Sequence, residues 1–137
     1  MTAEGLMSGK RGLVMGVAND HSIAWGIAQA CAAQGAELAF TYQGEAFGKR
    51  VKPLAASLGA KMVLPADVED EQSMEALFGE IERQWGGLDF VVHCIAFADK
   101  SELKGRYCDT SRKNFARALD ISCFSFTDIA RRAAPLM

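Results

Sequence analysis

Residues 11–35 constrain the fold most, because a short apolar run meets a glycine-containing loop and then an alanine-rich run. A strand, a glycine turn and a helix in this order are typical of parallel α/β sheets that hold a dinucleotide at the helix N-terminus. Gly16 can take the tight turn, and Gly26 would let the helix pack closely on the sheet. We expect the amides near Ser22 and Ile23 to meet the pyrophosphate. The loop departs from the GxGxxG spacing, so an ordinary turn remains an alternative.

The rest of the sequence alternates short apolar runs with longer amphipathic ones, which is typical of βαβ units. The apolar runs show little polar alternation, as is usual for strands covered on both faces. We therefore predict one domain over residues 1–137, an α/β fold with an incomplete, Rossmann-like doubly wound parallel sheet and flanking helices. The strand order is expected to be 3-2-1-4, and the four predicted strands are residues 11–16, 36–41, 62–65 and 88–94.

Three further helical segments follow from apolar spacing. Residues 70–85 carry apolar side chains at helical intervals and are followed by two glycines, which predicts a helix that ends at Gly86. Residues 45–58 contain Pro53, which cannot donate a helical hydrogen bond, so we expect a kink or two short helices. Residues 111–134 predict one long packing helix capped by Asp109 or Thr110, with a continuous stripe of Phe115, Ala118, Leu119, Ser122, Phe126, Ile129, Ala130 and Ala133.

Two more segments that suit a nucleotide follow the second and third strands. Gln43 stands where an acidic residue usually holds the ribose of NAD or an arginine holds the 2′-phosphate of NADP. Its amide can bind a ribose but offers no charge to a phosphate, which favours NAD, although Lys49 and Arg50 lie close in sequence. Asp67 and Val68 could accept a hydrogen bond from adenine and cover the ring. A helix N-cap at Asp67 is the alternative.

Composition excludes several classes of function. The formal net charge is −2, which gives no basic excess to attract nucleic acid. The strongly apolar run at residues 90–98 is far shorter than the ~20 residues of a membrane helix and contains His93, interpreted as a hydrogen-bonded core histidine. The four cysteines form no CxxC pair, so we expect reduced cysteines in the cytoplasm. No metal site is expected.

The sequence resembles the bacterial enoyl-acyl carrier protein reductases, a divergent branch of the short-chain dehydrogenase/reductases. The resemblance runs from residue 8 to residue 137 and rests on the segment GVANDHSIAWGIAQACAAQGAELAFTYQ, on Asp67-Val68, on HCIAF at 93–97 and on LDIS at 119–122. It implies a cytosolic homotetramer of fatty-acid synthesis. Such an enzyme uses NADH to reduce the double bond of an enoyl thioester carried by acyl carrier protein.

The resemblance also implies roles for particular residues. Gly16, Ser22 and Ile23 would bind the pyrophosphate, and Gln43 the adenosine ribose region. The remaining residues are Asp67 and Val68 at the adenine, Cys94, Ile95 and Ala96 beside the nicotinamide ribose, and Ile121 near the nicotinamide pocket or in the core. Family members often have serine and glycine at the positions of Cys94 and Ala96, so a hydroxyl is lost and a methyl gained there.

The family's catalytic Tyr-x6-Lys pair follows a fifth strand, which the resemblance places beyond Met137. Tyr42 and Lys49 have the same spacing, but they follow the second strand, at the adenosine end, so we interpret them as a coincidence. Two alternatives stay open. One is a non-catalytic nucleotide-binding module, and the other is a 3-oxoacyl reductase of the same superfamily.

Overall fold

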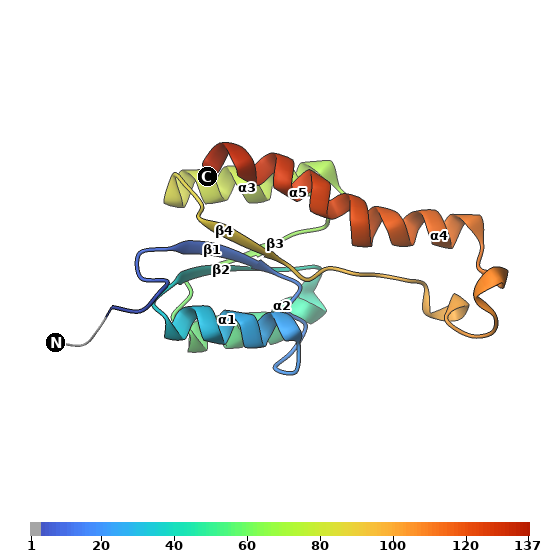
Figure 1. The fold of residues 1–137 in the computed structure, drawn as a ribbon, viewed down its shortest axis with the longest axis horizontal. Helices are drawn as coiled ribbons and strands as arrows, with labels where there is room; N and C mark the ends of the chain where they lie inside the picture. Colours follow the sequence, from blue (N-terminus) through green and yellow to red (C-terminus); the bar gives the residue numbers. More distant parts are fainter. Residues whose placement is uncertain (1–3) are drawn as a thin grey trace.

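A computed structural model describes residues 4–137 and contains a four-stranded parallel sheet in the order β3-β2-β1-β4. The strands are β1 (Arg11–Met15), β2 (Glu37–Tyr42), β3 (Met62–Pro65) and β4 (Phe90–His93). Helices α1 (Ile23–Ala33) and α2 (Glu45–Ser57) cover one face, while α3 (Glu71–Trp85) and α5 (Ser125–Ala133) cover the other (Figure 1). The predicted α/β, Rossmann-like sheet and its strand order are confirmed. No helix within residues 4–137 is long and apolar enough to cross a membrane.

Side chains that alternate along the strands build one hydrophobic core on each face of the sheet. On β1, Leu13 and Met15 point to the α3 and α5 side, where Ile81 and Ile129 are buried. Val14 points to the other side, against α1 and α2. Helices on both faces explain why the strands read as nearly continuous apolar runs.

Helix α3 has the boundaries that the sequence predicts. The Asp70 carboxylate accepts a hydrogen bond from the Gln72 N–H at 3.0 Å, which caps the N-terminus. Gly86 adopts a left-handed conformation with φ 69° and ends the helix.

Helix α2 is one continuous α-helix with Pro53 inside it, so of the two expected outcomes, a kink or two short helices, the second is wrong. Pro53 and the Lys49 backbone that would otherwise accept its hydrogen bond both lie on the exposed side, so water can replace the missing bond. Val51 and Ala55 are fully buried on the opposite side. Their packing holds the helix together through the proline.

The C-terminal helix is more irregular than predicted. It consists of α4 (Arg112–Leu119), a π-helical segment at Asp120–Phe124, and α5. The cap is Ser111, whose hydroxyl accepts a hydrogen bond from the Asn114 N–H at 3.0 Å, so the predicted caps Asp109 and Thr110 are wrong. Both precede the helix, Asp109 at the end of a short 3-10 helix.

The predicted apolar stripe on this helix is also partly wrong. Phe115, Leu119 and Phe126 are 45%, 50% and 61% exposed, and Ala130 is exposed too. The π-helical segment widens one turn and shifts the buried line, while α4 projects past the end of the sheet (Figure 1). The buried residues recur at intervals of four: Ile121, Ser125, Ile129 and Ala133.

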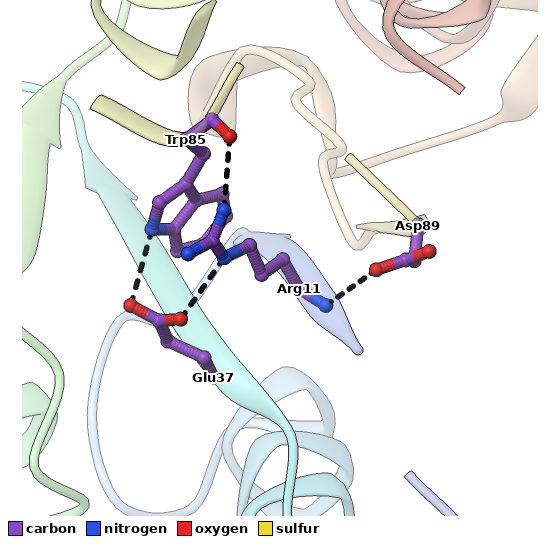
Figure 2. Close-up of polar contacts among 4 residues, drawn as sticks. All are labelled: Arg11, Glu37, Trp85 and Asp89. Carbon is purple, nitrogen blue, oxygen red and sulfur yellow. Dashed lines mark hydrogen bonds and ion pairs between the residues drawn. The ribbon is translucent and has the colours of Figure 1, made fainter. Parts of the chain in front are cut away.

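A polar cluster joins the first residues of β1 and β2, Arg11 and Glu37, to the last residue of α3, Trp85 (Figure 2). The Arg11 guanidinium donates to the Glu37 carboxylate at 3.0 Å and to the Trp85 carbonyl at 2.9 Å. The Trp85 indole N–H also donates to Glu37, at 3.2 Å, and the Arg11 backbone N–H donates to Asp89 at 2.8 Å. These bonds fix the end of the sheet that is farthest from the pocket described below.

At the other end of β4, His93 is tied to α5. Its Nε2 lies 2.8 Å from the Ser125 hydroxyl, which itself donates to the Ile121 carbonyl at 2.6 Å. Because the Ser125 hydroxyl hydrogen bonds the Ile121 carbonyl, the Ser125 oxygen accepts a hydrogen bond from His93. Nε2 of His93 therefore carries a proton. Burial lowers the pKa of His93 below its ordinary value. The predicted hydrogen bond of His93 is confirmed, but the residue is only partly buried and not in the core.

This pKa shift makes stability depend on pH. Unfolded His93 takes up a proton at higher pH than folded His93, so the free energy of unfolding falls as the pH drops from 7.5 to 5.5. Urea unfolding at several pH values measures this. His93→Gln, which keeps a donor near Ser125, should flatten the dependence, whereas His21→Gln on the exposed loop should not. An equal pH dependence in wild type and His93→Gln would contradict the prediction.

Candidate functional site

A pocket of about 420 Å³ opens at the carboxyl ends of the strands. Loops that follow all four strands line it, and α4 and the π-helical segment form another wall. Its volume lies in the range of pockets that hold small molecules or cofactors. In open parallel sheets, ligands bind at this edge, where the chain crosses to opposite sides of the sheet. Here that point lies between β1 and β4.

Gly16 forms the floor of the turn after β1. It has φ 102°, and an added Cβ would lie 1.9 Å from the Cys94 carbonyl oxygen. Next to it, the Cys94 N–H donates to the Met15 carbonyl at 3.0 Å. No side chain fits at Gly16, so two backbone segments approach each other closely beneath the pocket.

Ser22 and Ile23 do not line the pocket. The Ser22 hydroxyl accepts hydrogen bonds from the N–H groups of Ala18 at 3.0 Å and Asn19 at 3.2 Å, so it fixes the shape of the loop before α1. The Ile23 side chain is 81% exposed. Its backbone N–H lies at the start of α1, ahead of the Trp25 and Gly26 N–H groups, which donate to the Ser22 carbonyl at 3.0 and 3.3 Å.

The expected role of Gly26 is wrong. Gly26 is exposed, and an added Cβ there would meet no atom within 4 Å. The close approach of α1 to the sheet depends instead on Ala24 and Ala28, which are 1% and 0% exposed.

Gln43, Asp67 and Val68 line the pocket on the side of β2 and β3. The Asp67 N–H donates to the Ser73 hydroxyl at 2.9 Å, and the Asp67 carboxylate accepts from the Glu69 N–H at 2.9 Å. These bonds hold the turn rigidly. The alternative interpretation of Asp67 as a helix N-cap is wrong, since α3 is capped by Asp70.

On the opposite side of the pocket, Cys94, Ile95 and Ala96 form the wall after β4. Ile121 completes this wall from the π-helical segment and is 7% exposed, so it belongs to both the pocket and the core. The structure therefore brings together all the predicted site residues except Ser22 and Ile23.

Several lining residues were missed by sequence reasoning. Phe47, in the first turn of α2, is 41% exposed beside Gln43. Arg117 reaches the pocket from α4. Arg117 stands four residues before Ile121, so helical spacing could have placed both on one face of the helix. Nothing in the sequence pairs Arg117 with its partner, Glu69.

Arg117 and Glu69 form a two-point ion pair at the pocket wall. The Arg117 Nε and Nη2 donate to the two Glu69 carboxylate oxygens at 3.1 and 3.0 Å. These hydrogen bonds lower the pKa of Glu69 and raise that of Arg117, so both groups stay charged over the physiological range.

Tyr42 ends β2, and Lys49 lies in α2, which follows it. Tyr42 is 9% exposed and packs against Gly48, where an added Cβ would lie 2.9 Å from its ring. The Lys52 ammonium lies 5.0 Å from the ring centroid. Lys49 is exposed on α2, and both residues stand apart from the wall formed after β4.

Comparison with known proteins agrees with this geometry. The family described as Enoyl-(Acyl carrier protein) reductase matches residues 16–137. This chain belongs to the enoyl-(acyl carrier protein) reductase family. The "Enoyl-[acyl-carrier-protein] reductase [NADH] 2" of Rhizobium meliloti is 68% identical over 133 residues, or 97% of this chain and 50% of that protein. A Rickettsia felis relative, "Enoyl-[acyl-carrier-protein] reductase [NADH] FabI", is 52% identical over 97% of the chain and 51% of that protein.

Solved structures of enoyl-(acyl carrier protein) reductases have the same fold. FabI from Candidatus Liberibacter asiaticus superposes with a TM-score of 0.95 at 58% identity, covering 98% of this chain and 52% of that one. An Anaplasma phagocytophilum enoyl-(acyl-carrier-protein) reductase, solved in complex with NAD, has a TM-score of 0.94 at 57% identity and covers 99% and 52%. This chain spans about half the length of the curated relatives it matches.

Substitutions of two glycines test the geometry of the loop. Gly16→Ala forces a side chain into a left-handed backbone and against the Cys94 carbonyl, and should lower the free energy of unfolding by roughly 1–3 kcal/mol. Gly26→Ala, exposed in α1, should raise it by roughly 0.4–1 kcal/mol. Urea unfolding of both variants measures the difference. Equal effects of the same sign would show that the close approach at Gly16 is described wrongly.

Proposed function

We propose that this chain is the cofactor-binding part of an NADH-dependent enoyl-acyl carrier protein reductase of bacterial fatty-acid synthesis. The observation that carries the proposal is the pocket lined by the loops after β1 and β4, with Gly16 turned against Cys94. Membership of the reductase family and the names of its relatives, which include NADH, support the same activity and cofactor.

The pocket residues fit NADH chemically. Backbone amides near Gly16 and in the first turn of α1 supply donors and a partial positive charge for the pyrophosphate. Only glycine fits at position 16, where an added Cβ would have no room. Asp67 offers a carboxylate oxygen to the adenine amino group, with Val68 against the ring. When bound, NADH supplies a hydride. The remaining contacts are proposed for Ser22 and Ile23 at the pyrophosphate, Gln43 at the adenosine ribose, Cys94, Ile95 and Ala96 at the nicotinamide ribose, and Ile121 at the nicotinamide.

NADH is preferred over NADPH in this proposal because the ribose position lacks a cation. Gln43 is neutral, and Glu45 in the first turn of α2 adds a negative charge close by. A 2′-phosphate beside Gln43 would meet no arginine among the lining residues contributed by β2, its loop and α2. Lys49 and Arg50, exposed further along α2, are outside the pocket lining.

We also propose the parts of the reaction that this chain does not supply. The proton would come from the family's Tyr-x6-Lys pair, in sequence beyond Met137, since Tyr42 and Lys49 lie on the adenosine side. The active protein would be a cytoplasmic homotetramer that takes its enoyl thioester from acyl carrier protein. Exposed apolar side chains support association, above all Phe115, Leu119, Phe124 and Phe126 on the C-terminal helix, and four free cysteines suit a reducing compartment.

Enzyme assays of the intact natural protein test this proposal. We expect NADH to be oxidised when an enoyl thioester of acyl carrier protein is added, with NADPH a poorer donor, and light scattering to give four times the subunit mass. Lys49→Gln should leave the rate unchanged, since Lys49 lies on exposed α2.

Other outcomes favour the alternatives. Reduction of a 3-oxoacyl thioester without reduction of the enoyl thioester would move the protein to the ketoreductases. Tight NADH binding by a folded protein that turns over neither thioester would favour a non-catalytic nucleotide-binding module. A large loss of rate in Lys49→Gln would contradict the placement of the proton donor.

A further inference from the structure

Arg117 contacts both sides of the pocket. Its guanidinium forms the two-point ion pair with Glu69 in the loop after β3 and lies 4.6 Å from the ring centroid of Phe97 in the loop after β4. β3 and β4 are the two outer strands of the sheet. One side chain from α4 therefore connects loops that start at opposite edges. We call Arg117, Glu69 and Phe97 the clasp.

A backbone hydrogen bond holds each loop at the residue that it contributes to the clasp. The Phe97 N–H donates to the Ser122 hydroxyl at 3.0 Å, and that hydroxyl lies 3.3 Å from the Phe97 carbonyl, so the backbone under the Phe97 ring is fixed to the π-helical segment. On the other side, the Glu69 N–H donates to the Asp67 carboxylate. A displacement of Glu69 therefore also displaces Asp67, the proposed adenine ligand.

All three members of the clasp line the pocket. The ion pair and the stacked ring combine two interactions that favour arginine over lysine, namely two parallel hydrogen bonds to one carboxylate and contact with an aromatic face. Burial is partial, with 48% of the Arg117 and 31% of the Glu69 side chain exposed, so solvent screens the pair. Such a contact suits a role in setting the spacing of two loops better than a role in holding the fold.

We propose that Arg117 is a positioning residue, which holds the adenine side and the nicotinamide side of the pocket at the spacing that NADH binding requires. This inference rests on the proposed function and adds to it a residue outside the predicted site. Loss of either charged member frees both loops, so Arg117→Gln and Glu69→Gln weaken NADH binding in the same direction. A purely electrostatic influence on the anionic cofactor would give opposite directions, because one variant leaves a negative and the other a positive charge at the pocket.

Titration calorimetry with NADH on the intact protein tests the clasp. Arg117→Gln and Glu69→Gln should each raise the Kd for NADH by about threefold to tenfold. The double variant should bind no more weakly than the weaker single variant, because one interaction is lost only once. In steady-state assays the KM for NADH should rise while kcat is retained, and the melting temperature without NADH should stay close to that of wild type.

Matched controls come from α3, where Glu80 and Arg83 form a similar exposed two-point pair outside the pocket. Glu80→Gln and Arg83→Gln should leave the Kd unchanged. Three results would overturn the clasp alone, provided that the wild type binds NADH. These are an unchanged Kd in the clasp variants, shifts of the Kd in opposite directions, and additive losses of affinity in the double variant. A folded wild-type protein that binds no NADH would overturn the proposed function together with this inference.

Discussion

The close contact between Gly16 and the Cys94 carbonyl is the constraint on which the pocket depends. It keeps β1 and β4 together up to their carboxyl ends, and the chain then leaves the two strands toward opposite faces of the sheet. The loop after β1 leads to α1, and the loop after β4 leads to α4. A crevice at this point follows from the topology, while the missing Cβ at Gly16 brings backbone rather than side chains to its floor.

The pocket wall formed by α4 and the π-helical segment contains an irregular turn. At the π-helical segment, Ser125 satisfies the Ile121 carbonyl, and Ser122 holds the Phe97 backbone. Through Ser125 the same turn is bonded to His93 at the end of β4. Ile121 and Ser125 stand four residues apart, so the serine hydroxyl reaches the carbonyl one turn earlier. This segment thus links the last strand, its loop and the pocket wall, and π-helical turns are frequent near functional sites.

Sequence reasoning succeeded where signals were local and periodic. Apolar runs and glycines predicted the strands and the limits of α3, and the Rossmann-like topology predicted the strand order. The motifs and the family resemblance predicted most of the residues that line the pocket. It failed where distant contacts decide the outcome. The sequence predicts that Gly26 packs against the sheet, whereas the structure exposes it on α1. The π-helical segment, in the same helix as the exposed Phe115, leaves no periodic pattern in the sequence. Arg117 and Glu69 are 48 residues apart, so no local pattern pairs them.

The central claim is that the loops after β1, β3 and β4 form one dinucleotide pocket. A crystal structure of the intact protein with NAD tests it most directly. We expect the adenine beside Asp67 and Val68, the pyrophosphate over Gly16 and the first turn of α1, and the nicotinamide between Cys94 and Ile121. NAD bound away from Gly16, or with the adenine and nicotinamide ends exchanged, would contradict this account.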